Sequence, residues 1–200
     1  MTIFFLPGAG GSASFWRPVS DRLDRDEDRH FFAWPGLGNE PAEPDVNGIG
    51  DLVGRVVDAL EEASGPSVLV AQSMGGYVAM QATLAAPGRV RSLVLAVTSA
   101  GVPMDELGAS NWRESYRSGF PHAAPWIGDP TEDLSTKLPE VTAPCLLLWG
   151  DSDPISPVAV GKSLLGLLPD ARLHVLAGAD HDLAITHAAE VAALIRAHLA

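Results

Sequence analysis

Short runs of apolar residues alternate with longer stretches of helical periodicity along most of this 200-residue chain. The short runs are apolar almost throughout, which is typical of parallel strands covered by helices on both faces. The predicted strands are Ile3–Leu6, Phe31–Trp34, Val68–Ala71, Val90–Val97, Cys145–Trp149 and Arg172–Leu176. The predicted helices are Phe15–Leu23, Ile49–Ala63, Gly75–Ala85, Pro157–Leu168 and His187–Leu199. This alternation predicts βαβ units, and therefore an α/β fold with a mostly parallel open sheet of about six strands and helices on both faces.

One long segment, residues 98–139, interrupts this alternation with glycine, proline and charged residues and contains no clean strand. A stretch of this length between two strands is usually functional or a small inserted element. We interpret it as a small lid within a single domain that spans residues 1–200; the alternative is a connecting helix with loops. Its aromatic side chains are candidates for the wall of a substrate pocket, although a core role is an equal alternative for each: Trp112, Tyr116, Phe120 and Trp126.

Charge and cysteine content narrow the classes of partner and compartment. The chain has 13 Lys and Arg against 25 Asp and Glu, a formal charge of −12, which repels the phosphate backbone of nucleic acids. Cys145 is the single cysteine, so no intrachain disulfide forms and a reducing compartment fits best. The first residues do not form a signal-peptide pattern, and no apolar run approaches the roughly 18 residues of a membrane span. We expect a soluble, cytoplasmic protein that binds neither nucleic acid nor membrane, and the oligomeric state stays open.

The stretch LVAQSMGGYVAM, residues 69–80, leads from a predicted strand directly into a predicted helix through Ser73. A serine on such a tight turn is raised above the edge of the sheet, where the carbonyl of a substrate can reach it. The turn requires small neighbours, and Ala71, Gly75 and Gly76 provide them. This pattern favours a nucleophilic serine on an elbow turn; the alternative is a serine that caps the following helix.

A serine hydroxyl needs a base within hydrogen-bond reach, and the base needs an acid that orients it. Of the six histidines, His181 alone lies in a loop just past the carboxyl end of a predicted strand, the edge where parallel sheets bind ligands. His187 is the nearest rival, but a histidine on a terminal helix is more often solvated. The acid is Asp151 or Asp153 in the loop after the fifth strand, and their positions leave this choice open.

An acyl-transfer site also needs two N–H donors for the oxyanion. One donor is expected from the backbone of Met74, directly after the serine, and the other from the glycine-containing loop LPGAGGSASFW after the first strand. That loop lacks the G-K-[ST] of a P-loop, and Ala13 stands where a dinucleotide fingerprint has its third glycine. The chain has no H-E-x-x-H motif and no clustered zinc ligands, so we expect no metal and no cofactor.

Four segments in order resemble the α/β-hydrolase superfamily: FLPGAGGSASFW, AWPGLGNEP, VAQSMGGYVA, and the pair LLLWGDSDPISP and LAGADHDLAI. The order Ser, Asp, His is also that of the family. The resemblance implies that Ser73 is the nucleophile, His181 the base and Asp153 the acid. It implies further that the N–H of Ala9 is the loop donor of the oxyanion hole. Two positions depart from the pattern, because Pro7 replaces a histidine and Ala71 the first glycine of the turn.

The resemblance implies a serine esterase that hydrolyses small carboxylic esters or thioesters through an acyl-enzyme. Within the family, the sequence most resembles the branch of plant methyl esterases and hydroxynitrile lyases and the bacterial carboxylesterases. One alternative is lyase-type cleavage of a carbon–carbon bond. Those lyases carry a lysine after the histidine, whereas this chain has Asp182, which would repel an anionic leaving group. The other alternative is a ligand-binding protein without catalysis, which the presence of all four catalytic parts disfavours. The sequence does not distinguish ester from thioester or amide, nor the acyl and alcohol groups.

Overall fold

A computed structural model describes residues 1–23 and 27–200, and within them the strands form one six-stranded sheet in the order β2-β1-β3-β4-β5-β6. Each of the five neighbouring strand pairs is parallel, which confirms the predicted α/β architecture. The strands are β1 (Thr2–Leu6), β2 (Asp28–Phe31), β3 (Ser67–Gln72), β4 (Val90–Ala96), β5 (Cys145–Gly150) and β6 (Ala171–Leu176).

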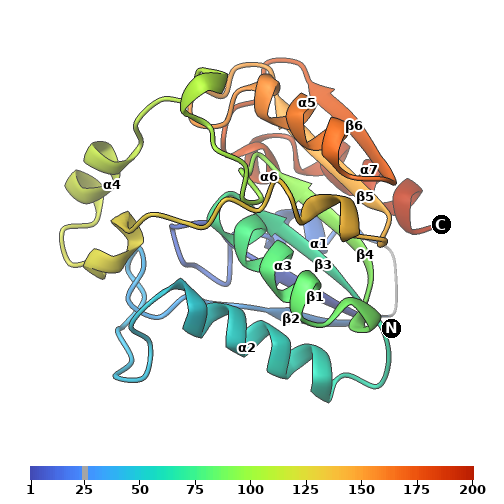
Figure 1. The fold of residues 1–200 in the computed structure, drawn as a ribbon, viewed down its shortest axis with the longest axis horizontal. Helices are drawn as coiled ribbons and strands as arrows, with labels where there is room; N and C mark the ends of the chain where they lie inside the picture. The colour runs from blue at the N-terminus through green and yellow to red at the C-terminus, as the bar shows by residue number, and fades with distance from the viewer. Residues whose placement is uncertain (24–26) are drawn as a thin grey trace.

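The helices cover both faces of this sheet. Figure 1 shows α2 and α3 in front of the strands, and α1 and α7 behind them. The helices are α1 (Arg17–Ser20), α2 (Ile49–Glu62), α3 (Met74–Ala85), α4 (Arg113–Gly119), α5 (Val158–Leu167), α6 (Leu183–Thr186) and α7 (Ala188–Leu199). Short 3₁₀ turns lie at Pro87–Arg89, Asp105–Leu107, Pro125–Gly128 and Leu138–Glu140. Among the described residues, no helix combines the length and the apolar composition needed to cross a bilayer.

Every residue of β1, β3 and β5 is buried, because helices pack on both sides of these strands.

The carboxyl end of β1 is held by two buried tryptophans. The indole N–H of Trp16 donates to the carbonyl of Leu6 at 2.9 Å, and that of Trp34 donates to the carbonyl of Pro7 at 2.7 Å. A buried indole N–H needs such a partner, and here the two bonds hold the backbone at the point where β1 ends.

One strand and one helix differ in their limits from the sequence prediction. The strand predicted at Phe31–Trp34 lies at Asp28–Phe31, because β2 is an edge strand whose residues alternate between exposed and half-buried instead of forming an apolar run. The helix predicted at Phe15–Leu23 is a single α-turn, Arg17–Ser20. The residues around it form successive i to i+3 turns, such as that from Leu23 N–H to Ser20 O.

The segment between β4 and β5, which we call the inserted segment (residues 98–139), contains no strand, as predicted. Its short helix α4 has no buried residue and lies at a distance from the sheet in Figure 1. Backbone hydrogen bonds tie the segment to the body on both sides of α4: Ser110 N–H donates to Pro154 O at 2.8 Å, and Ala124 N–H to Gly36 O at 2.7 Å. The inserted segment is therefore anchored at both ends while its helix remains exposed.

Candidate active site

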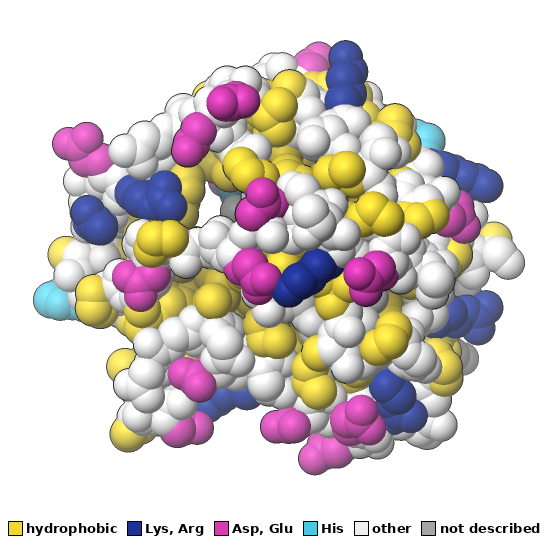
Figure 2. Space-filling view, viewed as in Figure 1, with side chains coloured by type: hydrophobic (Ala, Val, Ile, Leu, Met, Phe, Trp, Pro, Cys, Tyr) yellow, Lys and Arg dark blue, Asp and Glu magenta, His cyan; other side chains and the backbone are white. Residues whose placement is uncertain are grey.

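The loops that follow β1, β3, β5 and β6 meet at one edge of the sheet. The chain order reverses between β1 and β3, and the crevice outside the carboxyl ends of strands at such a reversal is where open α/β sheets bind ligands. A cavity of about 940 Å³ lies there, lined by these loops, by the start of α3 and by the inserted segment. Figure 2 shows the surface hollowed beside the inserted segment. The volume is within the range of small-molecule sites.

Ser73 is the single residue between β3 and α3. Its φ of 53° and ψ of −124° lie in a region where residues other than glycine are rare. The turn is held by β4 and the residues after it: Ser73 N–H donates to Ala96 O at 3.0 Å, and the hydroxyl of Thr98 donates to Ser73 O at 2.6 Å. The Ser73 side chain makes no capping hydrogen bond to α3, so the alternative of a helix-capping serine is wrong.

The small residues around Ser73 are explained by the close approach of the chain to β1. A Cβ atom on Gly75 would lie 2.3 Å from the carbonyl oxygen of Pro7, so only glycine allows α3 to begin against the end of β1. Ala71 is fully buried in β3, and the methyl group that departs from the family pattern is accommodated there.

The imidazole of His181 lies between Ser73 and Asp153. Its Nε2 is 2.9 Å from Ser73 Oγ, and its Nδ1 is 2.7 Å from Asp153 Oδ2. The ring is partly exposed to the cavity, whereas the Asp153 side chain is fully buried. The other oxygen of Asp153 accepts the N–H groups of Ile155 at 2.8 Å and Ser156 at 3.2 Å. Three side chains from distant parts of the sequence thus form one continuous hydrogen-bonded chain.

The geometry separates the two aspartates that the sequence left open. Asp151 is exposed, and its Oδ1 accepts the N–H of Gly178 at 2.8 Å and the hydroxyl of Ser152 at 3.0 Å. These contacts join the loop after β5 to the loop after β6. Asp153, not Asp151, is hydrogen-bonded to His181. The rival histidine, His187, bonds through Nδ1 to the hydroxyl of its neighbour Thr186 at 2.9 Å.

Ala9 and Met74 both line the cavity, as does Ser73. Ala9 lies in a four-residue turn that is closed by the bond from Gly11 N–H to Gly8 O at 3.0 Å. Within the described part of the chain, no protein acceptor is bonded to either N–H group, so both are available to a ligand.

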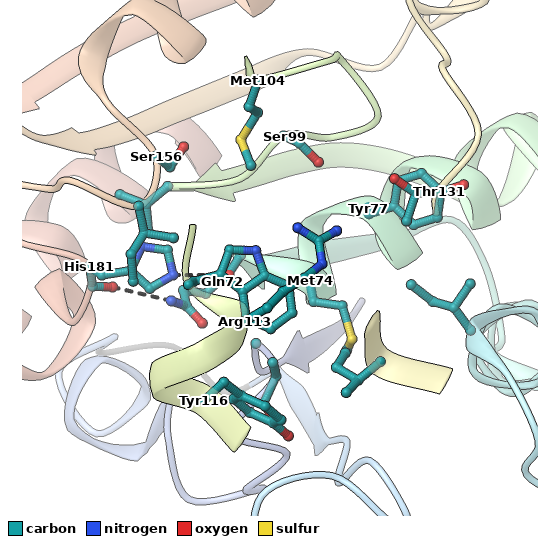
Figure 3. A pocket seen from close by; sticks show the side chains of 18 of the residues that line it. Gln72, Met74, Tyr77, Ser99, Met104, Arg113, Tyr116, Thr131, Ser156 and His181 are labelled. Carbon is teal, nitrogen blue, oxygen red and sulfur yellow. Dashed lines mark hydrogen bonds between the residues drawn. The ribbon is translucent and has the colours of Figure 1, made fainter. Parts of the chain in front are cut away.

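All four aromatic residues predicted for the pocket line the cavity: Trp112, Tyr116, Phe120 and Trp126. The first three form a row along α4, with ring centroids 5.6 Å apart for Trp112 and Tyr116 and 5.0 Å apart for Tyr116 and Phe120. Figure 3 shows Tyr116 on one side of the pocket and Tyr77 on the other. Burial raises the pKa of the Tyr116 hydroxyl, and a hydrogen bond from the Gly38 amide partly offsets this effect.

Sequence reasoning missed Gln72, the residue before the serine. Its side chain is 3% exposed and its amide Nε2 donates to the backbone carbonyl of His181 at 3.1 Å, a bond visible in Figure 3. The partner is a backbone atom 109 residues away, and no pattern in the sequence signals such a contact.

Cys145, the single cysteine of the sequence, carries a free thiol. It is buried in β5, and burial raises the pKa of its thiol to about 12, so it is not ionised at neutral pH. Among residues 1–23 and 27–200, no group of three or more His, Cys, Asp or Glu side chains is arranged to hold a metal ion.

Curated relatives match nearly the whole chain at low identity. The polyketide synthase ThaQ of Burkholderia thailandensis is 24% identical over 92% of this chain, but the chain spans only 11% of that protein. A pimeloyl-[acyl-carrier protein] methyl ester esterase of Neisseria meningitidis is 26% identical, over 97% of this chain and 75% of that protein. Among solved structures, a meta-cleavage product hydrolase from Pseudomonas fluorescens superposes with a TM-score of 0.81 at 18% identity, covering 100% of this chain and 90% of that one.

The sequence profile of the alpha/beta hydrolase family matches residues 3–194, almost the full length of the chain. This match agrees with the parallel sheet, with the turn at Ser73 and with the superposition on a solved hydrolase. The protein therefore belongs to the alpha/beta hydrolase family.

Proposed function

We propose that this protein hydrolyses small carboxylic esters or thioesters by a serine mechanism in which Ser73, His181 and Asp153 act as nucleophile, base and acid. The observation that carries this proposal is the chain of hydrogen bonds from Asp153 Oδ2 to His181 Nδ1, 2.7 Å, and from His181 Nε2 to Ser73 Oγ, 2.9 Å, at the wall of a large cavity. The methyl ester esterase of Neisseria meningitidis among the relatives supports the same reaction class.

In the first half-reaction, Ser73 Oγ attacks the carbonyl carbon of the ester and its proton passes to His181 Nε2. Asp153 is buried and accepts a hydrogen bond from Nδ1–H of His181. This bond holds the ring in the required tautomer and stabilises the imidazolium. The carbonyl π electrons move to oxygen and form a tetrahedral oxyanion. When this intermediate collapses, His181 protonates the alcohol or thiol that leaves, and the acyl group remains on Ser73.

In the second half-reaction, water replaces the alcohol. His181 removes a proton from the water as it attacks the acyl carbon, and returns the proton to Ser73 Oγ when the carboxylic acid leaves. The unpaired N–H groups of Ala9 and Met74 stabilise the oxyanion in both steps. The loss of one such donor typically lowers the rate about 10²- to 10³-fold.

The inserted segment acts as a lid over the substrate. Its aromatic side chains supply apolar surface opposite Ser73, and the cavity volume of about 940 Å³ leaves room for an acyl chain together with its leaving group. Asp182 also lines this cavity, directly after His181, and its negative charge opposes a cyanide-like leaving group. Ester hydrolysis is therefore favoured over lyase chemistry.

A fluorophosphonate probe combined with an ester panel tests the proposal. We expect the probe to label the wild-type protein and not Ser73→Ala, and p-nitrophenyl esters of increasing acyl length to be hydrolysed by the wild type only. Equal labelling of both proteins, or undiminished turnover by Ser73→Ala, would remove Ser73 from the reaction. Release of cyanide from mandelonitrile without ester hydrolysis would favour the lyase alternative.

A further inference from the structure

The hydroxyl group of Tyr116, a residue that lines the cavity, is hydrogen-bonded to two backbone atoms. It donates to the carbonyl oxygen of Ala9 at 2.7 Å and accepts the N–H of Gly38 at 2.9 Å. Tyr116 belongs to α4 of the inserted segment, whereas Ala9 belongs to the loop after β1 and Gly38 to the loop after β2. One phenol therefore joins three separate segments at the edge of the site.

The carbonyl that Tyr116 binds belongs to the central peptide of a tight turn. Gly8 O accepts Gly11 N–H, so Ala9 and Gly10 are the two central residues of this turn. The peptide between two central residues can flip and convert a type I turn into a type II turn, provided that the second residue tolerates a positive φ. Gly10 tolerates it, but its φ is not positive in this structure. The turn is therefore in one of two conformations that its sequence permits.

The backbone of Gly10 packs closely against Gly38, but the hydrogen bonds from Trp34 reach only the residue before the turn and its last residue. Trp34 donates through its indole to Pro7 O at 2.7 Å and through its backbone N–H to Gly11 O at 2.9 Å. Neither bond reaches the peptide between Ala9 and Gly10. Among the described residues, the Tyr116 hydroxyl is the protein hydrogen-bond donor to that peptide's oxygen. A flip would break this bond and reverse the peptide dipole next to the N–H of Ala9.

We propose that Tyr116 is a positioning residue for the oxyanion site: its bond to Ala9 O fixes the Ala9–Gly10 peptide and so holds the backbone of Ala9, including the N–H on its other side, in one conformation against α4. The inference rests on the proposed function, because it assumes that the Ala9 amide stabilises an oxyanion. Burial keeps the pKa of the Tyr116 hydroxyl raised, so the group remains a donor over the neutral and mildly alkaline range. The contact of α4 with the loop after β1 thus also steadies the residue that supplies the Ala9 N–H.

The test is Tyr116→Phe, which removes the hydroxyl and keeps the ring, assayed with p-nitrophenyl acetate, whose acyl group is too short to depend on the lid. We expect kcat to fall about 10- to 100-fold, the scale of a displaced transition-state contact. KM should stay within about threefold of wild type, since ground-state binding is retained. Affinity for a trifluoromethyl ketone, which forms an anionic adduct with Ser73, should fall by the same factor as kcat/KM.

The matched comparator is Tyr77→Phe. The Tyr77 hydroxyl also binds the inserted segment, accepting the N–H of Glu132 at 3.1 Å; its other hydrogen bond within residues 1–23 and 27–200 comes from Gln81, not from the loop after β1. An equal loss of kcat in the two variants would mean a general loosening of the inserted segment and would overturn the proposal. So would a wild-type kcat in Tyr116→Phe, or a change confined to KM.

Ser73→Ala separates the two levels of inference. If Ser73→Ala is inactive and Tyr116→Phe is as active as wild type, the positioning role is wrong while the proposed function stands. If Ser73→Ala retains full activity, the proposed function itself fails, and with it the role assigned to Tyr116.

Discussion

The side-chain amide of Gln72 donates a 3.1 Å hydrogen bond to the backbone carbonyl of His181, and so joins the end of β3 to the loop after β6. Gln72 directly precedes Ser73, so the serine and the imidazole are linked twice. One link is the contact between Nε2 and Oγ, and the other passes through the backbone of His181. The second link does not involve any reacting atom.

Replacement of Gln72 by Met should lower kcat about tenfold with little change in KM, because the loop that carries His181 loses a buried anchor. The unfolding free energy should fall by about 1 kcal/mol, the typical net value of one hydrogen bond. Steady-state kinetics and urea denaturation measure the two effects. Gln81→Met is the control, since the Gln81 amide bonds to the hydroxyl of Tyr77 and not to His181. Equal kcat values for Gln72→Met and wild type would contradict the prediction.

The two aspartates after β5 should differ sharply in their effect on turnover. Asp153→Asn replaces the acceptor of the His181 Nδ1 proton by an amide and should lower kcat by about 10⁴-fold through the wrong tautomer. Asp151→Asn, the isosteric control, should retain turnover, because the hydrogen bonds of Asp151 within the described residues go to Gly178 and Ser152 and not to His181. Ester kinetics on both variants decide the matter. If Asp151→Asn abolished turnover and Asp153→Asn did not, the assignment of Asp153 as the acid would be wrong.

Gly75→Ala should destabilise the protein by about 1–3 kcal/mol, as expected for an overpacked site. The new methyl group would stand 2.3 Å from the carbonyl oxygen of Pro7 and push α3 away from β1. Gly54→Ala is the matched control: Gly54 is exposed on α2, and beyond its chain neighbours and the local helix backbone nothing lies within 4 Å of the added carbon. That change should stabilise by about 0.5–1 kcal/mol through helix propensity. Urea unfolding of both variants gives the two signs, and a loss of stability for both would refute the packing argument.

Stability should decrease as the pH falls below about 6.5, the pKa of an unperturbed histidine. Burial lowers the pKa of His198, whose Nε2 lies 2.7 Å from Ser92 Oγ; the carbonyls of Pro144 and Leu93 and the carboxylate of Asp170 partly oppose the shift, and Arg172 adds to it. The unfolded chain then binds a proton that the folded protein resists, so the unfolding free energy drops until the lower folded pKa is reached.

Denaturation curves at pH 8, 7, 6 and 5 measure this slope. His198→Gln removes the titrating group and should flatten the slope between pH 7 and 5 relative to wild type. Identical slopes in the two proteins would show that other groups dominate the pH dependence.

The central part of the fold was predictable because strands buried on both faces leave continuous apolar runs. β3 and β5 are therefore found where the sequence indicates them, within one residue at each end. β2 was misplaced because an edge strand is buried on one side only, and its residues Asp28–Phe31 do not form such a run.

The sequence predicted which loops share one edge of the sheet, but not the contacts among their residues. Parallel strands deliver their following loops to one edge, and this rule alone brings Ser73, Asp153 and His181 to the same region. The roles of Gln72 and Tyr116 were not predictable, because each donates to a backbone carbonyl that any residue provides. Contacts of this kind follow from the folded geometry and leave no mark in the pattern of residue types.

The inserted segment leaves the sheet after β4 and returns at β5, so a single excursion of the chain forms the roof of the cavity. Ser73, Asp153 and His181, the side chains of the proposed mechanism, lie outside this excursion. Its length and composition can therefore be exchanged, provided that the replacement keeps Thr98, whose hydroxyl donates to Ser73 O, and restores a hydroxyl at the position of Tyr116. For protein engineering, residues 99–139 thus form a replaceable segment with which substrate preference can be redesigned while the proposed triad and the Thr98 contact to Ser73 stay fixed.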